Sequence, residues 1–344
     1  MNDRFIKACN REKTDATPVW FMRQAGRFLP EYRKIRENHT ILEICKTPDL
    51  CAEVTTLPVD ILDVDAAILF ADIMLPLEAM GADLELRDGA GPIVHNCING
   101  FQSANSLVEL EPDTDLSFVM EAVRASKERL SSRVPLIGFC GAPFTLASYL
   151  IEGRSTRDFL KTKRLMYNDS KTWHLLMDKL ATSMGLYLDD QIKAGVDAVQ
   201  LFDSWVGCLS PQDYHRYVLP YSRKILAHLE NAKKPRIHFG TGTANLLDEM
   251  KQAGGDVFGI DWRIPIDIAW CRLGYDVAIQ GNLDPAVLLA DIGLVKSQVA
   301  EILARVGNKP GHIFNLGHGI LPDTPQETVL EIVNFIHEHT KTDA

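Results

Sequence analysis

The sequence predicts a (β/α)8 barrel of parallel strands, built from one domain over residues 1–344 with a small β-hairpin insertion. Eight short apolar runs recur along the chain, stretches with helical spacing separate them, and polar residues gather just after the runs. A doubly wound sheet is the main alternative. It would usually show fewer units and a G-x-G-x-x-G loop after the first strand, where this chain has Arg23-Gln24-Ala25-Gly26.

The eight expected strands share short runs of aliphatic, β-branched and aromatic residues. They cover residues 19–22, 66–70, 136–140, 198–202, 236–239, 257–260, 277–280 and 312–316. Apolar residues at three- and four-residue spacing predict helices over 170–194, 211–231, 244–253, 285–306 and 325–340. Three of these helices begin with a turn residue and a proline, as an N-cap and first helical position do: Ser210-Pro211, Asp284-Pro285 and Thr324-Pro325.

Residues 83–96 interrupt this alternation. Polar and apolar residues alternate through Leu84-Glu85-Leu86-Arg87-Asp88-Gly89 and then resume at Pro92-Ile93-Val94, with glycines between the two runs. This pattern predicts an inserted hairpin. The chain has no low-complexity stretch, linker or short-period repeat, which favours one domain with insertions.

Composition excludes several classes of protein. The net charge is −10, which argues against nucleic acid as a partner. No apolar run approaches the ~18 residues of a membrane span, and the first seven residues are too charged for a signal peptide, so we expect a cytoplasmic protein without a membrane partner. The seven cysteines are odd in number and form no C-x-x-C pair, which argues against a disulfide framework and a structural zinc site.

A basic cluster follows the first expected strand. Four arginines occur within fourteen residues, at Arg23, Arg27, Arg33 and Arg36. Arginine is always charged and presents a planar fork of donors to carboxylates, so the cluster indicates a site for a polyanion within an acidic chain. The alternative is a surface helix with solvated charges.

Polar residues at the expected carboxyl ends of the strands mark the place where barrel enzymes carry their active sites. They include Gln24 after the first strand, Asp72 after the second, Tyr149 beyond the third, Ser204 after the fourth and His318 after the eighth. Each has a structural alternative. For example, Asp72 can cap an expected helix over 73–80. The functional case rests on their joint placement on one rim.

Two long segments resemble signatures of the uroporphyrinogen decarboxylase family. They span residues 18–32, beginning Pro18-Val19-Trp20, and residues 138–149, beginning Gly138-Phe139-Cys140. Three shorter segments match in the same order: Phe70-Ala71-Asp72-Ile73, Leu201-Phe202-Asp203-Ser204 and Asn315-Leu316-Gly317-His318-Gly319. The resemblance covers residues 3 to 340.

The resemblance implies a cofactor-free barrel enzyme, usually a homodimer, and no metal site is expected. It would convert uroporphyrinogen to coproporphyrinogen by removing CO2 from four acetate side chains, in haem biosynthesis. By motif position, the substrate-binding residues are Arg23, Gln24, Arg27, Arg36, Asp72, Tyr149, Ser204 and His318. Asp72 and Arg23 would also be catalytic.

The chemistry of this reaction sets three demands on the protein. The eight carboxylates of the substrate need anchors, the pyrrole N–H groups need a negative partner, and a pyrrole carbon must be protonated so that its ring can accept the electrons of the departing CO2. Arginines suit the first task. An ionised Asp72, favoured by nearby arginines, suits the second. Arg23 is our candidate on the proton-donor side.

Other expected contacts follow from side-chain chemistry. A partly charged His318 would bind a substrate carboxylate, and Tyr149 and Ser204 would donate hydrogen bonds to others. Three aromatic residues are candidates for apolar walls against the macrocycle, with core packing as the alternative for each: Phe139, Phe144 and Phe202.

Two rival functions remain. A zinc- or corrinoid-dependent methyltransferase of the same superfamily would carry H-x-C, whereas the corresponding place reads His238-Phe239-Gly240 and lacks the soft thiolate. A non-catalytic tetrapyrrole-binding protein would keep the arginines but would not need Asp72. Turnover discriminates it from an enzyme.

Overall fold

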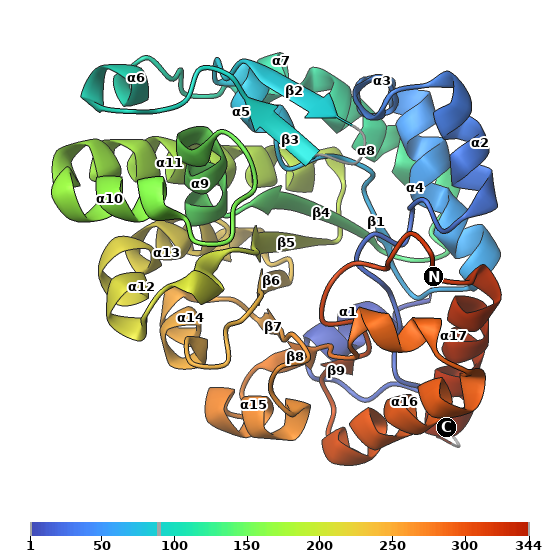
Figure 1. Ribbon diagram of the computed structural model, residues 1–344. Coiled ribbons are helices and arrows are strands. Elements are labelled where there is room, and N and C mark those ends of the chain that lie inside the picture. The colour runs from blue at the N-terminus through green and yellow to red at the C-terminus, as the bar shows by residue number, and fades with distance from the viewer. Residues whose placement is uncertain (1, 88–90, 343–344) are drawn as a thin grey trace.

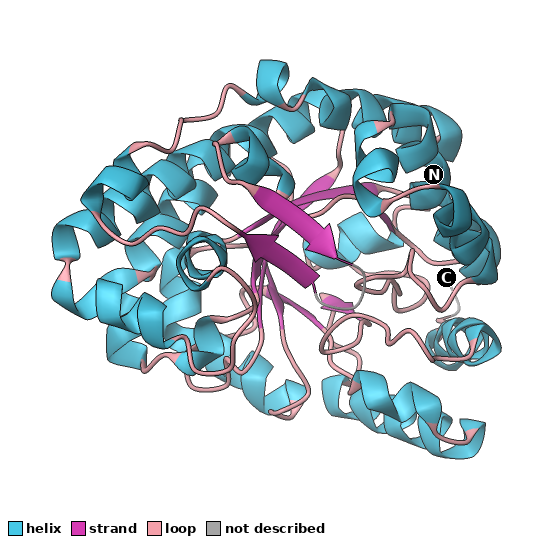
Figure 2. Cartoon of the chain, turned by 45° about the horizontal axis from the view of Figure 1, so that its top comes forward, coloured by secondary structure: helices cyan, strands magenta, loops and turns pink. Residues whose placement is uncertain are grey.

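The computed structural model describes residues 2–87 and 91–342, and its centre is a sheet of seven parallel strands. The strands follow one another in space as β1 (Ala67–Ile68), β4 (Leu136–Gly141), β5 (Ala198–Asp203), β6 (Arg236–Gly240), β7 (Val257–Gly259), β8 (Ala278–Gln280) and β9 (His312–Ile313). Figure 2 shows these strands surrounded by helices. The predicted class, a single-domain (β/α)8 barrel, is confirmed.

The first expected strand closes the sheet without forming a regular ladder. Val19 makes a parallel bridge with Phe314, and the amide of Asp65 donates to the carbonyl of Val19 at 2.8 Å. Backbone bonds also join Trp20 N to the carbonyl of Phe314 and Phe314 N to that of Pro18, at 3.3 and 2.9 Å. Two further amides donate to side chains, Val19 N to Asp65 Oδ2 at 2.7 Å and Met22 N to Asn315 Oδ1 at 3.2 Å. Residues 18–22 therefore lie between the two outermost strands and take the eighth position of the barrel.

Helices connect the strands and cover the outside of the sheet (Figure 1). Before β4 they are α1 (Arg4–Cys9), α2 (Pro30–Asn38), α3 (Ile41–Lys46), α4 (Pro48–Leu62), α5 (Leu75–Ala79), α6 (Phe101–Asn105), α7 (Pro112–Asp115) and α8 (Ser117–Leu130). After β4 they are α9 (Pro143–Glu152), α10 (Leu160–Asn168), α11 (Ser170–Ala194), α12 (Pro211–Tyr217), α13 (Leu219–His228), α14 (Leu247–Ala253), α15 (Ile266–Leu273), α16 (Ile292–Val306) and α17 (Gln326–Thr340), with 3-10 turns η1 (Val206–Cys208), η2 (Glu230–Ala232) and η3 (Pro285–Leu289).

Two predicted helices are broken in the structure, and in each case a local signal explains the break. The stretch 211–231 divides at Val218 into α12 and α13, since Pro220 has no amide to continue the first helix. The stretch 285–306 divides into η3 and α16 because Asp291 caps the amides of Gly293 and Leu294. The predicted helix over 170–194 is confirmed to the residue.

The proline-marked helix starts have mixed outcomes. Ser210 caps α12 by accepting from Asp213 N, and Asp284 caps η3 by accepting from Ala286 N. The cap predicted at Thr324 is wrong: α17 begins after Pro325, and the Thr324 hydroxyl has no hydrogen-bond partner within the part of the chain that the structure describes.

The predicted insertion is an antiparallel hairpin of β2 (Leu84–Arg87) and β3 (Gly91–Val94). Its predicted glycine-containing turn, including Asp88 and Gly89, lies outside the described residues. In Figure 1 the hairpin lies apart from the seven-stranded sheet, beside α5. The insertion therefore adds to the barrel without interrupting its strand order.

The barrel interior is an apolar cluster distinct from the larger core between sheet and helices. It includes Trp20, Ile137, Ile237 and Ile313, together with Phe5 from α1. Near the end of the described chain, Thr342 N donates to the carbonyl of Asp15 at 2.8 Å, which joins the C-terminal segment to the one that precedes the first strand. Among the described helices, none is long and apolar enough to span a bilayer.

Candidate active site

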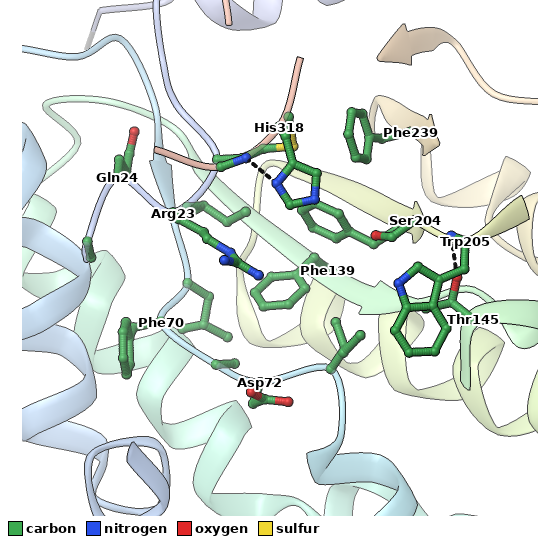
Figure 3. Close-up of a pocket in the computed structure, with 18 of the residues that line it drawn as sticks. Arg23, Gln24, Phe70, Asp72, Phe139, Thr145, Ser204, Trp205, Phe239 and His318 are labelled. Carbon is green, nitrogen blue, oxygen red and sulfur yellow. Dashed lines mark hydrogen bonds between the residues drawn. The ribbon is translucent and has the colours of Figure 1, made fainter. Parts of the chain in front are cut away.

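A cavity of about 270 Å³ opens at the carboxyl ends of the strands. Six of the eight residues predicted for the site line it, and they come from five different places in the sequence: Arg23 with Gln24, Asp72, Tyr149, Ser204 and His318. Figure 3 shows Asp72 and His318 on opposite sides of the cavity, with the Arg23 side chain between them. The barrel thus brings these groups onto one rim.

Aromatic rings form the apolar wall of the cavity. Phe139 of β4 packs edge-on against Phe202 of β5, with ring centroids 5.4 Å apart, and Phe202 packs in the same way against Phe239 of β6 at 5.7 Å. All three line the cavity, as predicted for Phe139 and Phe202. Phe144 is fully buried against Trp173 and belongs to the core, the alternative considered for it.

Arg23 is held in an unusual backbone conformation directly after the barrel segment. Its φ is +60°, a left-handed value that side-chain-bearing residues seldom adopt. Such strain is sustained by the surrounding structure and is common at functional positions. Within residues 2–87 and 91–342, the guanidinium has no hydrogen-bond or ion-pair partner, so it is available to an anion in the cavity.

Asp72 begins the turn that leads into α5. Its Oδ1 accepts a hydrogen bond from Met74 N at 2.9 Å, so it caps the turn in addition to lining the cavity. Burial raises the pKa of its carboxyl group, while the Met74 amide and the charge of Arg23 act in the opposite direction. Arg23 therefore favours the ionised form, as expected from the sequence, but desolvation is the larger effect on this pKa.

His318 is neutral in the folded protein. Burial, together with the positive charges of Arg23 and Arg263, lowers the pKa of His318 to about 4. The expected partial charge is therefore not supported. Its Nδ1 accepts from Gly319 N at 2.7 Å, which puts the proton of the neutral ring on Nε2. In Figure 3 the second ring nitrogen lies on the side of the His318 ring where Ser204 is, so His318 is a hydrogen-bond donor there.

Tyr149 and Ser204 share the side of the cavity formed by β5 and α9. The Tyr149 ring packs on Trp205 with centroids 4.0 Å apart, and burial and the Asp72 charge raise the pKa of its hydroxyl. The carbonyl of Ser204 accepts from Thr241 Oγ1 at 2.8 Å, which holds the Ser204 backbone in place. Because its pKa is raised, the Tyr149 hydroxyl keeps its proton and is a hydrogen-bond donor at any ordinary pH.

The side chains of Gln24, Arg27 and Arg36 are placed differently from those of the other five predicted residues. Gln24 is fully buried, and its amide bonds the backbone, accepting from Phe21 N at 3.1 Å and donating to Ala66 O at 3.0 Å. In Figure 3 it points away from the other labelled residues. Arg27 and Arg36 are not among the lining residues, and Arg36 Nη1 donates to the carbonyl of His39.

Residues that sequence reasoning did not single out also line the cavity. Thr145 accepts from Trp205 N at 3.4 Å and donates to Asp203 Oδ1 at 3.3 Å, so it joins two strand ends. Phe70 and Trp205 lie within two residues of Asp72 and Ser204, which the strand-end pattern had selected. The signal for both was therefore present, but an aromatic residue beside a strand cannot be told from a core residue without its neighbours.

The side chains that could ligate a metal ion are dispersed. Within 2–87 and 91–342 there is no group of three or more histidine, cysteine, aspartate or glutamate residues arranged to hold a metal ion. His238, in the segment that corresponds to a zinc motif in the rival methyltransferases, is fully buried, with Asp203 Oδ2 4.0 Å from its Nε2. It is not one of the cavity residues.

Comparison with known proteins gives a consistent result over the whole chain. Residues 1–339 match the family model described as "Uroporphyrinogen decarboxylase (URO-D)". The chain is 51% identical to a protein named uroporphyrinogen decarboxylase from Sorangium cellulosum, over 98% of this chain and 96% of that protein. It is 52% identical to one of the same name from Thermus thermophilus, over 98% of both chains.

Among solved structures, a methyltransferase from Methanosarcina mazei has a similar fold. The TM-score is 0.82 with 98% of both chains covered, but only 19% of the aligned residues are identical. A similarity at this level of identity concerns the fold alone.

Proposed function

The chain belongs to the uroporphyrinogen decarboxylase family, and we propose that its strand-end cavity converts uroporphyrinogen III to coproporphyrinogen III by four successive acetate decarboxylations. The enzyme is then a carboxy-lyase of haem biosynthesis. The observation that carries the proposal is the meeting of Arg23, Asp72 and His318 in one cavity of a chain that matches the family over residues 1–339.

Asp72 is the proposed partner of the pyrrole N–H groups. A carboxylate can accept several N–H bonds that converge on one point, and its charge would stabilise the cationic ring that forms when a pyrrole carbon is protonated. Burial raises its pKa, and the N–H donors of the substrate together with the positive charge of Arg23 would favour the ionised state.

The proposed reaction consists of a protonation, the loss of CO2 and a second protonation. Protonation of a pyrrole carbon makes the ring an electron sink, the bond between the acetate methylene and its carboxylate breaks, and CO2 leaves. The exocyclic methylene that remains takes a second proton and becomes a methyl group as the ring proton is lost. Since the substrate supplies its own sink, the reaction requires no cofactor.

Arg23 is the proposed anchor of the reacting acetate and stands on the proton-donor side. Its unpaired guanidinium in the cavity supports the first role. An arginine is too weak an acid to donate its own proton readily, so in the second role it would hold a water or a substrate carboxylic acid in place. Neutral His318, Tyr149 and Ser204 would donate hydrogen bonds to carboxylates without adding charge.

The other predicted residues fit a wider binding surface. We propose that Arg27 and Arg36 reach carboxylates that project beyond the cavity. We assign Gln24 to holding the backbone that precedes Arg23, since both ends of its amide are engaged there. A homodimer in the cytoplasm, without a nucleic-acid partner, completes the proposal. The net charge of −10 supports the last part.

The decisive experiment is an anaerobic incubation with uroporphyrinogen III, without added cofactor or metal, and separation of the products by number of carboxylates. Products with seven, six, five and four carboxylates are expected. If a folded protein binds the substrate and releases no CO2, the tetrapyrrole-binding alternative replaces the enzyme. Stoichiometric zinc in the purified protein would favour the methyltransferase instead.

A further inference from the structure

The cavity is too small to enclose the whole proposed substrate. Its volume of about 270 Å³ is below the range of about 300–1000 Å³ for pockets that enclose ordinary small ligands. A macrocycle of four pyrroles with eight carboxylate arms is larger than such ligands. Some of its arms must therefore extend past the cavity, and the charges on the surrounding rim decide how well they are held.

The loop that follows β7 is built to hold its residues in one position. Asp261 is 1% exposed, and its carboxylate accepts from Gly242 N at 2.6 Å and from Arg263 N at 3.2 Å. Asn282 Nδ2 donates to the carbonyls of Asp261 and Ile264 at 2.9 and 2.8 Å. Neighbouring loops thus hold this segment on both sides of Arg263.

The Arg263 guanidinium is fixed in orientation yet open to solvent. Its Nη1 pairs with Asp261 Oδ2, and its central carbon lies 4.1 Å from the centroid of the Trp262 ring. The side chain is nevertheless 50% exposed. A guanidinium has five N–H donors, and the pairing with Asp261 uses the Nη1 side, which leaves the other donors for a second anion.

This loop lies directly against the loop that carries His318. A Cβ added at Gly317 would be 2.6 Å from the backbone nitrogen of Trp262 and 2.8 Å from its ring, so only glycine permits the contact. The charge of Arg263 is also close enough to disfavour protonation of His318. Arg263 therefore lies close to His318, just beyond the residues that line the cavity.

We propose that Arg263 is a further substrate-binding residue, which holds a carboxylate arm outside the cavity on the His318 side. The proposal rests on the proposed function. Asp261 and Trp262 position the guanidinium before the substrate arrives, so that little side-chain entropy is lost when the carboxylate binds. Because the arm is remote from the reacting acetate, the contact contributes to binding and not to the chemical step.

The test compares initial rates for the wild type, Arg263→Gln, Arg263→Lys and the control Arg305→Gln under anaerobic conditions. Arg305 also pairs with carboxylates and is 40% exposed, but it lies on the outer helix α16. For Arg263→Gln we expect KM for uroporphyrinogen to rise about fivefold with kcat nearly unchanged, as for loss of a half-exposed charge-assisted contact. Its KM should also depend less on ionic strength than that of the wild type.

The outcomes separate this proposal from the proposed function. If the wild type turns over and Arg263→Gln has the same KM as the wild type and Arg305→Gln, the role of Arg263 is wrong but the proposed function stands. The same conclusion follows if Arg263→Gln lowers only kcat. Absence of turnover by the wild type would overturn the function, and the inference with it. If Arg263→Gln does not fold, Arg263→Lys decides: the proposal requires a smaller rise in KM, since lysine keeps the charge and loses the planar fork.

Discussion

The Arg23 side chain occupies the space that a side chain at Gly319 would fill. A Cβ built at residue 319 would lie 2.4 Å from Cδ of Arg23, 2.7 Å from its Cγ and 3.1 Å from its Cβ. Residue 319 follows His318 near the end of the chain, and Arg23 follows the first barrel segment. Closure of the barrel therefore brings a glycine from one end of the sequence against the proposed catalytic arginine from the other.

Gly319→Ala should displace Arg23 from the cavity with little effect on folding. The new methyl group overlaps the Arg23 stem, which can rotate away, so we expect kcat/KM to fall at least about tenfold and the free energy of unfolding to change by about 1 kcal/mol. Steady-state kinetics and urea unfolding measure the two effects. Gly100→Ala is the matched control, because no atom lies within 4 Å of a Cβ at that position. Unchanged kinetics would show that the position of Arg23 does not limit catalysis.

Asp72→Asn should keep the fold and lose the reaction. The asparagine Oδ1 can still accept from Met74 N, so the turn before α5 is preserved. Loss of the negative charge removes the partner of the cationic pyrrole, and we expect kcat to fall about a hundredfold or more. Measurement of CO2 release beside circular dichroism tests this. Asp291→Asn, at a helix cap outside the cavity lining, should retain activity. Near-normal turnover by Asp72→Asn would exclude an essential carboxylate.

His318 should make stability depend on acid pH. Its pKa is about 4 in the folded chain, against an ordinary value of 6.5, so between these values the unfolded chain binds a proton that the folded chain does not. The free energy of unfolding should therefore decrease as pH falls through this window, by up to about 1.4 kcal/mol per unit, and level off below it.

The difference between wild type and His318→Gln isolates this contribution, because His312, whose pKa burial also lowers to about 4, is present in both proteins. Urea unfolding across the window should give a smaller decrease for His318→Gln than for the wild type. The exposed His215→Gln serves as the control and should follow the wild type. Identical pH dependence in all three would contradict a neutral, buried His318.

A substitution of Gln24 tests whether this side chain binds the substrate or supports the backbone. In Gln24→Met the shape is kept, but Phe21 N and Ala66 O lose their buried partners, so we expect a loss of about 1–3 kcal/mol in the free energy of unfolding. Thermal or urea unfolding measures it, beside KM for uroporphyrinogen. A rise in KM without loss of stability would instead support the direct substrate contact that motif position implies.

Much of the fold follows from local patterns. The alternation of apolar runs and helical stretches predicted the barrel, its strand order and the hairpin, because these depend on spacing within short segments. The first strand differs, since the amides of Val19 and Met22 donate to the side chains of Asp65 and Asn315 and not to backbone carbonyls. No period in the sequence records such long-range substitutions.

The sequence by itself determined which residues follow the strands, and hence that Arg23, Asp72, Tyr149, Ser204 and His318 share one rim. Only the tertiary structure decided their chemical state and their surroundings. His318 is neutral and Gln24 is engaged with the backbone because burial and contacts between distant segments set pKa and hydrogen bonding. Those quantities depend on distances through space, which spacing along the chain does not specify.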